Sequence, residues 1–321
     1  MEGGRPETLC CPDCSSGEAL PLLAHLSARG LKTLWTPISL SAFGVLFSLS
    51  IQFFRNGESP MARIYPLFSS SKGNSTFIGT EQGGILIDCG VSFKRLSAAL
   101  EVNNIPLSAI QAVFITHEHS DHIAGLAMLT KKTGMPVYGQ KRTLQRLCDS
   151  GKIASSSPVI DMTGKAIACG GSEVTCFNTP HDTIQSCGYR IHTSDDKYCA
   201  VCTDLGHVTP KVDEALTGCR LVLLEANYDE NMLRTGPYPL YLKERILSMN
   251  GHLSNDDSAA QIGKLIERGT THFILGHLSQ DNNHPWLADY TVENSLSRFT
   301  RSKDYLLGVA PVETNGGAVI F

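Results

Sequence analysis

The hydrophobic and polar positions of this chain are arranged differently before and after about residue 60. After it, short apolar runs rich in Val, Ile and Phe alternate with stretches in which apolar residues recur three or four positions apart. The short runs predict buried strands, and the spacing of three and four predicts helices with one face in a core. We expect strands at 63–67, 76–79, 84–87, 112–116, 173–177, 188–192, 198–203, 221–224 and 272–275, and helices at 92–101, directly after 121, at 255–268 and at 286–301.

The order of these elements predicts an α/β fold. Closely spaced strands come first, as in hairpins, and strands that alternate with helices follow. This order is typical of two mixed sheets that are covered by helices, which is an αββα four-layer sandwich. We expect residues 61–321 to form this domain, because the pattern of elements is regular from Met61 onward, and no internal repeat is visible.

Residues 1–60 are expected to lie outside that domain. An uncharged run at 34–54 is long enough for a transmembrane helix. However, Pro37 lies within it, and apolar residues from Val45 onward alternate with polar ones as they do in a strand. We interpret residues 1–60 as an extension translated from upstream of a natural start at Met61 and expect no membrane binding. A weak membrane segment is the alternative.

Composition and charge narrow the class of protein. A net charge of −4 over 321 residues provides no electrostatic basis for tight, nonspecific binding of nucleic acid. The 11 cysteines are scattered and odd in number, which argues against a disulfide scaffold. Cys199 and Cys202, three positions apart on an expected strand, should point to opposite faces as buried free thiols. Free thiols fit a reducing compartment, the cytoplasm.

The segment after the expected strand 112–116 contains the candidate chemistry. His117, His119, Asp121 and His122 occur within six residues. His117 and His119 project to the same side while the chain is extended, and Asp121 and His122 follow in the first turn of a helix. One short loop thus offers imidazole and carboxylate ligands to two neighbouring divalent ions. A surface loop with chance histidines is the much rarer alternative.

The pattern His-x-His-x-Asp-His after an apolar strand resembles the signature of the metallo-β-lactamase superfamily. Three later segments resemble the rest of that pattern in the expected order: Asn-Thr-Pro-His-Asp around His181, Cys-Thr-Asp-Leu-Gly around Asp204, and Leu-Gly-His-Leu around His277. The resemblance extends from Met61 to the C-terminus. It implies the αββα fold and a hydrolase that uses two bound metal ions.

The resemblance also implies a set of ligands. Two ions roughly 3.5 Å apart can share a water molecule and lower its pKa to near 7. We expect zinc ions, with manganese as the alternative. Asp88, at the end of the strand 84–87, is expected to orient the histidine loop without binding metal. One ion would be held by His117, His119 and His181, the other by Asp121, His122 and His277, with Asp204 bridging the two.

Two further segments indicate a phosphodiester substrate. Leu-Glu-Ala around Glu225 and Gly-His-Leu-Ser around His252 resemble elements of the phosphodiesterase branch that includes tRNA 3′-end endonucleases. In that branch a Glu–His pair is thought to protonate the departing oxygen, because an alkoxide is a poor leaving group. We expect His252 to be this acid, Glu225 to orient it, and Asp121 to take part in catalysis with them. A histidine beside the Ser254 helix cap is the structural alternative.

Within the superfamily the chain resembles the bacterial YycJ/WalJ-like exonuclease group. The similarity lies in Leu-Phe-Ser-Ser-Ser-Lys-Gly-Asn-Ser-Thr at 67–76, Gly-His-Leu-Ser-Asn at 251–255 and the tail from Gly308. The group is associated with 5′→3′ exonuclease activity, so DNA is the expected partner, and no stable protein partner is indicated. The segment 69–75 is also compatible with a simple turn between strands. After His181, Asp-Thr-Ile-Gln-Ser-Cys replaces the expected Asp-Ala-x-Glu-Pro.

Two other functions remain open at this point. The same site could serve a small-molecule hydrolase that acts on a thioester, a lactone or a cyclic phosphodiester. The scarcity of positive charge on this chain favours such a substrate over a nucleic acid. A regulatory protein that keeps metals only for structure is the third possibility, which a missing ligand would have favoured. The Glu225–His252 pair favours the phosphodiesterase.

Overall fold

The computed structural model describes residues 63–80 and 83–321. The predicted extension at 1–60 lies outside the described residues, and its interpretation stays a prediction. Within the described residues, no helix is both long and apolar enough to cross a membrane.

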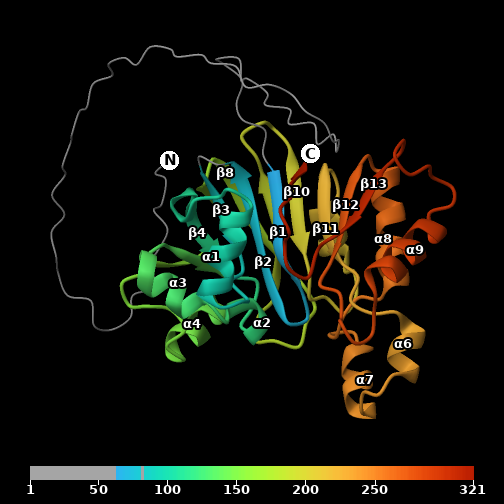
Figure 1. The fold of residues 1–321 in the computed structure, drawn as a ribbon, viewed down its shortest axis with the longest axis horizontal. Helices are drawn as coiled ribbons and strands as arrows, with labels where there is room; N and C mark the ends of the chain where they lie inside the picture. The colour runs from blue at the N-terminus through green and yellow to red at the C-terminus, as the bar shows by residue number, and fades with distance from the viewer. Residues whose placement is uncertain (1–62, 81–82) are drawn as a thin grey trace, which may run out of the picture. The chain divides into compact units, whose positions relative to one another are not determined.

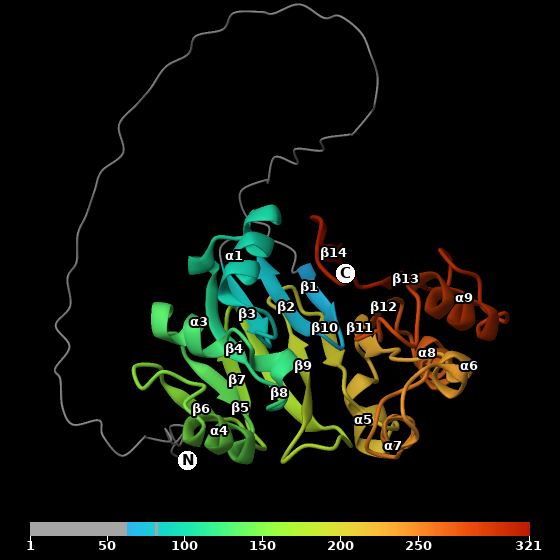
Figure 2. The same ribbon diagram turned by 60° about the horizontal axis from the view of Figure 1, so that its bottom comes forward.

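Two seven-stranded mixed sheets form the centre of the described domain (Figures 1 and 2). In spatial order, the first sheet contains β14 (Val319–Ile320), β1 (Arg63–Ser70), β2 (Gly73–Thr80), β3 (Gly83–Ile87), β4 (Ile110–Phe114), β5 (Val137–Gly139) and β6 (Val159–Asp161). The second sheet contains β13 (Leu306–Val309), β12 (His272–Gly276), β11 (Leu221–Glu225), β10 (Tyr198–Cys202), β9 (Cys187–His192), β8 (Ser172–Asn178) and β7 (Ala166–Cys169).

The two sheets have the same mixture of strand directions. Strands β14, β1, β2 and β3 pair antiparallel, and β3 to β6 pair parallel. In the second sheet β7 to β10 pair antiparallel, and β10 to β13 pair parallel. Parallel strands need long crossover connections, so the helices follow from this topology.

Helices cover the outer face of each sheet, which completes the predicted αββα sandwich. On the first sheet these are α1 (Phe93–Val102), the short α2 (Ser120–Ile123), α3 (Leu126–Thr133) and α4 (Lys141–Asp149), with a 3₁₀ turn at Leu107–Ala109. The second half of the chain contains α5 (Pro210–Leu216), α6 (Glu230–Thr235), α7 (Leu240–Ile246), α8 (Asn255–Glu267) and α9 (Pro285–Ser295).

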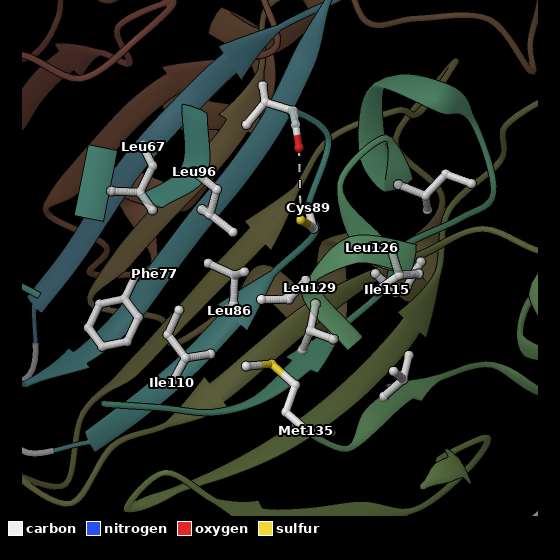
Figure 3. Close-up of a cluster of buried hydrophobic side chains, with 14 of the residues drawn as sticks. Leu67, Phe77, Leu86, Cys89, Leu96, Ile110, Ile115, Leu126, Leu129 and Met135 are labelled. Atoms are coloured by element: carbon white, nitrogen blue, oxygen red, sulfur yellow. Dashed lines mark hydrogen bonds between the residues drawn. The ribbon is translucent and has the colours of Figure 1, made fainter. Parts of the chain in front are cut away.

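Three apolar layers hold the domain together, and alternation along the strands separates them. On β3, Ile85 and Ile87 point into the layer between the sheets, while Leu86 points toward the helices of the first sheet (Figure 3). Each fully buried Ile or Leu contributes roughly 1.5–3 kcal/mol. The cysteines follow the same rule: Cys199 faces the inner layer and Cys202 the outer one, both as buried free thiols, as predicted.

The predicted elements are present, with changes at their ends. The expected strand 112–116 ends at Phe114, and the helix expected up to residue 301 ends at Ser295. Leu296 turns into the core there, and the chain folds back so that Arg301 pairs with Asp289 of α9 at 2.8 Å. Several short elements were not predicted, namely β5, β6, β7, β13, β14, α4, α5, α6 and α7.

Candidate metal centre

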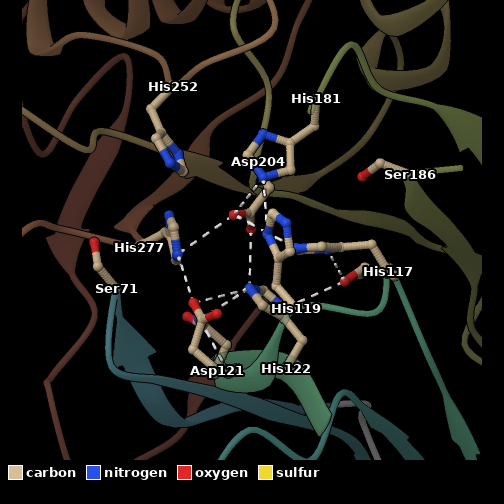
Figure 4. Close-up of polar contacts among 12 residues, drawn as sticks. Ser71, His117, His119, Asp121, His122, His181, Ser186, Asp204, His252 and His277 are labelled. Atoms are coloured by element: carbon tan, nitrogen blue, oxygen red, sulfur yellow. Dashed lines mark hydrogen bonds and ion pairs between the residues drawn. The ribbon is translucent and has the colours of Figure 1, made fainter. Parts of the chain in front are cut away.

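The predicted ligands meet where strands of both sheets end. His117 follows β4, Asp204 follows β10 and His277 follows β12, while His181 lies in the loop between β8 and β9. Figure 4 shows their side chains turned toward one point. The structure thus brings together all seven predicted residues, which are His117, His119, Asp121, His122, His181, Asp204 and His277.

The histidine loop has the predicted local structure. The chain after Phe114 is extended, and the rings of His117 and His119 lie edge to face with centroids 4.7 Å apart. His119 is the N-cap residue of α2, and Asp121 and His122 lie in the single turn of that helix. The extended part of this loop therefore carries His117 and His119, and its helical part carries Asp121 and His122.

The donor atoms of the described residues form four overlapping groups, one of which joins Asp204 and His277 to Glu225 and His252, and two of the four match the predicted clusters. In the first, single donor atoms of His117, His119 and His181 all lie within 4.8 Å of one another. In the second, Oδ2 of Asp121 is 3.4 Å from Nε2 of His122 and 3.5 Å from Nε2 of His277. These are the two groups that the family resemblance implied.

Asp204 lies between the clusters. Its Oδ1 is 3.7 Å from Nε2 of His181 and 3.4 Å from Nε2 of His277, and its Oδ2 is 3.3 Å from Nε2 of His122. One carboxylate thus faces donors of both clusters, as a bridging ligand must.

The donor set fits two divalent cations. Nε2 of His117 and Oδ2 of Asp204 are buried, and neither has a hydrogen-bond partner among the described residues. Leaving such a group unsatisfied costs roughly 1–3 kcal/mol, which a bound cation would offset. Imidazole nitrogens and carboxylates are also the donors that zinc and similar ions prefer.

Burial and charge act differently on the rings. Burial lowers the pKa of His117 well below its ordinary value, and the neighbouring imidazoles act in the same direction, so this ring stays neutral. Burial also opposes protonation of His277, but the carboxylates of Asp204, Asp121 and Glu225 outweigh it and raise its pKa to about 10. A proton therefore competes with a cation for His277.

Three of the site residues have a left-handed backbone conformation, which sets the direction of their side chains. Asp88, Asp204 and His277 have φ values of 61°, 58° and 55°, and each follows a strand end by one or two residues. This conformation costs a non-glycine residue about 1–2 kcal/mol. The packing around the site offsets that cost and fixes where these side chains point.

Glu225 and His252 form the predicted pair. Nδ1 of His252 lies 2.7 Å from Oε1 of the fully buried Glu225. Burial favours the neutral form of this carboxyl, but the charge of His252 and hydrogen bonds from His252 and His277 hold the pKa of Glu225 well below its ordinary value. Oε2 accepts hydrogen bonds from the backbone N–H groups of Leu205 and Leu253 at 2.9 and 3.2 Å. The carboxylate is therefore fixed in place.

A family model described as the β-lactamase superfamily domain matches residues 84–277 of this chain. The chain belongs to the metallo-β-lactamase superfamily. It is 38% identical over 236 residues to the exodeoxyribonuclease WalJ of Streptococcus pneumoniae. The aligned residues cover 72% of this chain and 87% of that protein. It is 35% identical over 233 residues to the exodeoxyribonuclease YycJ of Bacillus anthracis, with the same two shares.

A solved structure agrees with the superfamily fold. The zinc-bound PqqB of Methylobacterium extorquens superimposes with a TM-score of 0.61 at 16% identity, covering 81% of this chain and 100% of that protein. At this identity the likeness concerns the fold alone.

Asp88 contacts the histidine loop of this superfamily member, where the sequence predicted it. Its Oδ2 lies 2.7 Å from Nδ1 of His122, and Oδ1 accepts the backbone N–H of Thr116 at 2.8 Å. The Thr116 hydroxyl also donates to Oδ2 at 2.8 Å and lies 3.0 Å from Nδ1 of His117. One aspartate therefore orients rings of both clusters.

Two asparagines that contact the candidate metal centre were not predicted from the sequence. Nδ2 of Asn74 lies 3.3 Å from Oδ2 of Asp121 and 3.1 Å from Nε2 of His122. Nδ2 of Asn227 donates to the backbone oxygen of His277 at 2.8 Å. Asn74 lies in the segment 69–75, whose similarity to a known group was the available signal, whereas Asn227 had none.

Proposed function

We propose that this chain is a metal-dependent phosphodiesterase that degrades DNA as an exonuclease, in the 5′→3′ direction. The observation that carries the proposal is the position of His252. Its ring lies beside one predicted ligand of each cluster, with centroids 5.0 Å from His181 and 5.3 Å from His277. The two exodeoxyribonucleases that share more than a third of the aligned residues support DNA as the substrate.

We propose the ligand assignment that the sequence implied, with Asp204 shared between the ions. The two donor clusters and the unpartnered buried atoms support it. We propose zinc for both positions, since imidazole nitrogens and carboxylate oxygens suit that ion, and manganese is the alternative. When bound, the ions would supply an activated water and neutralise charge on the phosphate.

The protein's own contribution is a proton delivered at a fixed place. Glu225 holds Nδ1 of His252, so Nε2 is the nitrogen left to face a substrate. Nε2 has no hydrogen-bond partner among the described residues, and 17% of the side chain is exposed. His252 would donate its Nε2 proton to the leaving oxygen of the nucleotide. Glu225 stabilises the protonated ring before that transfer.

Asp121 and Asp204 would supply charge rather than protons. Asp121 is held by Nδ2 of Asn74 and by the rings of His122 and His277. Its negative charge, with that of Asp204, balances the cations, and the hydrogen bonds fix its direction.

The decisive experiment assays metal-loaded protein on labelled double-stranded DNA, single-stranded DNA and RNA, with bis-p-nitrophenyl phosphate as a small diester. We expect about two metal ions per chain by elemental analysis and stepwise release of nucleotides from 5′ ends of DNA. Hydrolysis of a thioester or lactone without any cleavage of diesters would reject the phosphodiesterase. Metal content near zero, with no activity restored by added zinc or manganese, would reject the metal centre.

We also propose a cytoplasmic location. The described cysteines are all free thiols, five of them buried, which is typical of proteins in a reducing compartment.

A further inference from the structure

The segment between β11 and α8 is attached directly to the metal centre. It contains α6 and α7, which project beyond the sheets in Figure 1, and a small apolar cluster of Tyr228, Leu233 and Ile246. The backbone oxygen of Gly251 lies 2.9 Å from Nδ1 of His181. The loop after α7 therefore contacts a predicted metal ligand, and the backbone N–H of His252 in that loop donates to the backbone oxygen of Ile246, the last residue of α7, at 3.0 Å.

Arg245, in the last turn of α7, lies at the edge of the candidate metal centre. Its Nε contacts Oδ2 of Asp182, and its Nη2 donates to Oδ1 of the same carboxylate at 3.1 Å. That Oδ1 is 3.5 Å from Nε2 of His181. Nη1 has no hydrogen-bond partner among the described residues, and half of the side chain is exposed, at 50%. A single carboxylate thus holds a guanidinium beside the first cluster with one donor group free.

The turn between β1 and β2 occupies the other side. The hydroxyl of Ser71 accepts a hydrogen bond from Nδ2 of Asn227 at 3.2 Å, and the same amide donates to the backbone oxygen of His277. Figure 4 shows Ser71 beyond His277, on the side of Asp204 away from His181. The Ser71 hydroxyl hydrogen has no acceptor in the described part of the chain. Next to it, Lys72 is exposed and has no carboxylate within 4.0 Å among the described residues.

Gly90 and Asn74 connect this turn to the histidine loop. A Cβ at Gly90 would lie 1.7 Å from the backbone oxygen of Asp121 and 2.5 Å from the backbone nitrogen of Asn74, so Gly90 packs closely between them. The side chain of Asn74 donates to the backbone oxygen of Ser70 at 2.9 Å and to that of Asp121 at 3.4 Å. One amide therefore contacts both the end of β1 and the histidine loop.

We propose that Arg245 and the Ser71–Lys72 turn bind the phosphates on the two sides of the phosphate that is cleaved. The inference rests on the proposed nuclease function and extends it to the path of the strand. A guanidinium with a free donor, a hydroxyl with a free hydrogen and an unpaired ammonium are groups that bind phosphate oxygens. They flank the metal pair on a chain whose net charge is −4, so they provide local attraction that the overall charge does not.

The test compares Arg245→Gln and Lys72→Gln with the unaltered holoenzyme on a 5′-phosphorylated single-stranded oligonucleotide. Each variant should raise KM by about 10- to 100-fold, the range for removal of a charged hydrogen bond, with kcat nearly unchanged. The slope of log affinity against log salt should become shallower by about 0.7 for each phosphate that the variant no longer binds. The increases in KM should multiply in the double variant, because the two groups bind different phosphates.

Matched controls separate this from general charge effects. Arg234, on α6 of the same segment, is paired with Glu230, and Lys94 is exposed on α1, so Arg234→Gln and Lys94→Gln should leave KM unchanged. Bis-p-nitrophenyl phosphate has no neighbouring phosphates, so its kcat/KM should be the same in all these variants.

Two outcomes would overturn the inference. If Arg245→Gln loses metal or slows bis-p-nitrophenyl phosphate as much as DNA, Arg245 only supports Asp182 and His181. If the unaltered enzyme cleaves DNA and both variants have its KM, the strand takes another path and the proposed function stands alone. An unaltered enzyme without activity on any diester would instead overturn the proposed function, and this inference with it.

Discussion

Glu225 shows how one residue can serve two parts of a site. Its Oε1 lies 2.7 Å from Nδ1 of His252 and also 2.8 Å from Nδ1 of His277. The sequence predicted only the first contact. The second follows from sheet register, because Glu225 pairs with Gly276 across β11 and β12, which puts it beside His277. Register across parallel strands is not readable from one sequence, so this contact could not be predicted.

The seven predicted ligands could be named from the sequence because four of them form one short motif after β4, and the other three, like Asp88, lie in segments that resemble the superfamily pattern. Asn227 and Arg245 were not named from the sequence, because each reaches the site by a contact with a residue that is distant in the chain. Asn227 reaches His277, and Arg245 reaches Asp182. Their roles depend on the packing of connections that have no spacing rule of their own.

Replacing His252 tests the general acid. His252→Ala should keep both metal ions and lower kcat on DNA by roughly 10²–10⁴-fold, the usual contribution of a positioned acid. The loss should nearly disappear with a p-nitrophenyl leaving group, which departs without a proton. Asp204→Asn, which removes the shared ligand, should instead impair both substrates. Equal losses on both leaving groups in His252→Ala would mean that His252 is structural.

Replacing Glu225 should have a double effect, because it contacts both rings. In Glu225→Gln we expect the same dependence on leaving group as in His252→Ala, together with a roughly 10- to 100-fold loss of metal affinity from the weakened support of His277. Metal titration and the two-substrate assay measure the two effects separately. Glu244→Gln, on the exposed face of α7, is the control. Unchanged metal affinity would show that the His277 contact is dispensable.

At the scale of elements, predictability followed strand length and burial. The strands β10, β11 and β12 are buried almost throughout, so they read as continuous apolar runs. The missed strands β5, β7 and β14 have only three, four and two residues, too few positions to establish a period. Helices α6 and α7 were missed because only Leu233 and Ile246 of these two helices are buried, which leaves no apolar stripe.

The close packing of the β1–β2 turn against the metal loop predicts a sensitive glycine. Gly90→Ala should lower the free energy of unfolding by roughly 1–3 kcal/mol, because its Cβ meets backbone rather than a movable side chain. It should also reduce metal content, since Asp121 is displaced. Thermal unfolding and elemental analysis measure the two effects. Gly308→Ala on β13 meets no atom within 4 Å and should be nearly neutral, so similar losses in both variants would contradict this account.

At the scale of the whole molecule, the centre joins the two sheets. His117, His119, Asp121 and His122 follow a strand of the first sheet, and His181, Asp204 and His277 follow strands of the second. Ions bound there would link the two halves of the domain. The family resemblance implied that these seven residues converge in one cleft between the sheets, and the structure places them together. Spacing along the chain alone would not have brought loops of both sheets to one point.

Removing the metals should therefore destabilise the domain. A ligand present at about 1,000 times its Kd stabilises by roughly 4 kcal/mol, which for a domain of this size corresponds to about 10 °C in Tm. Thermal unfolding with and without a chelator measures the difference. Zinc added back should restore the Tm, whereas an unchanged Tm would mean that the ions contribute nothing to holding the sheets together.

The prediction for residues 1–60 is tested by deletion. A chain that begins at Met61 should fold and cleave DNA with the kcat of the full chain. Loss of folding, or of an association with membranes present in the full chain, would show that residues 1–60 belong to the functional protein.

The position of β14 affects how the protein is made. This strand pairs with the start of β1, where Ile64 lies opposite Val319, so two neighbouring strands of the first sheet come from distant parts of the sequence. During translation, this part of the β1 edge stays unpaired until residues 319–320 have been synthesised. An unpaired edge is an open template for other strands. We therefore expect a nascent chain to pair with other chains more readily than the folded domain, in which β14 covers this part of the edge.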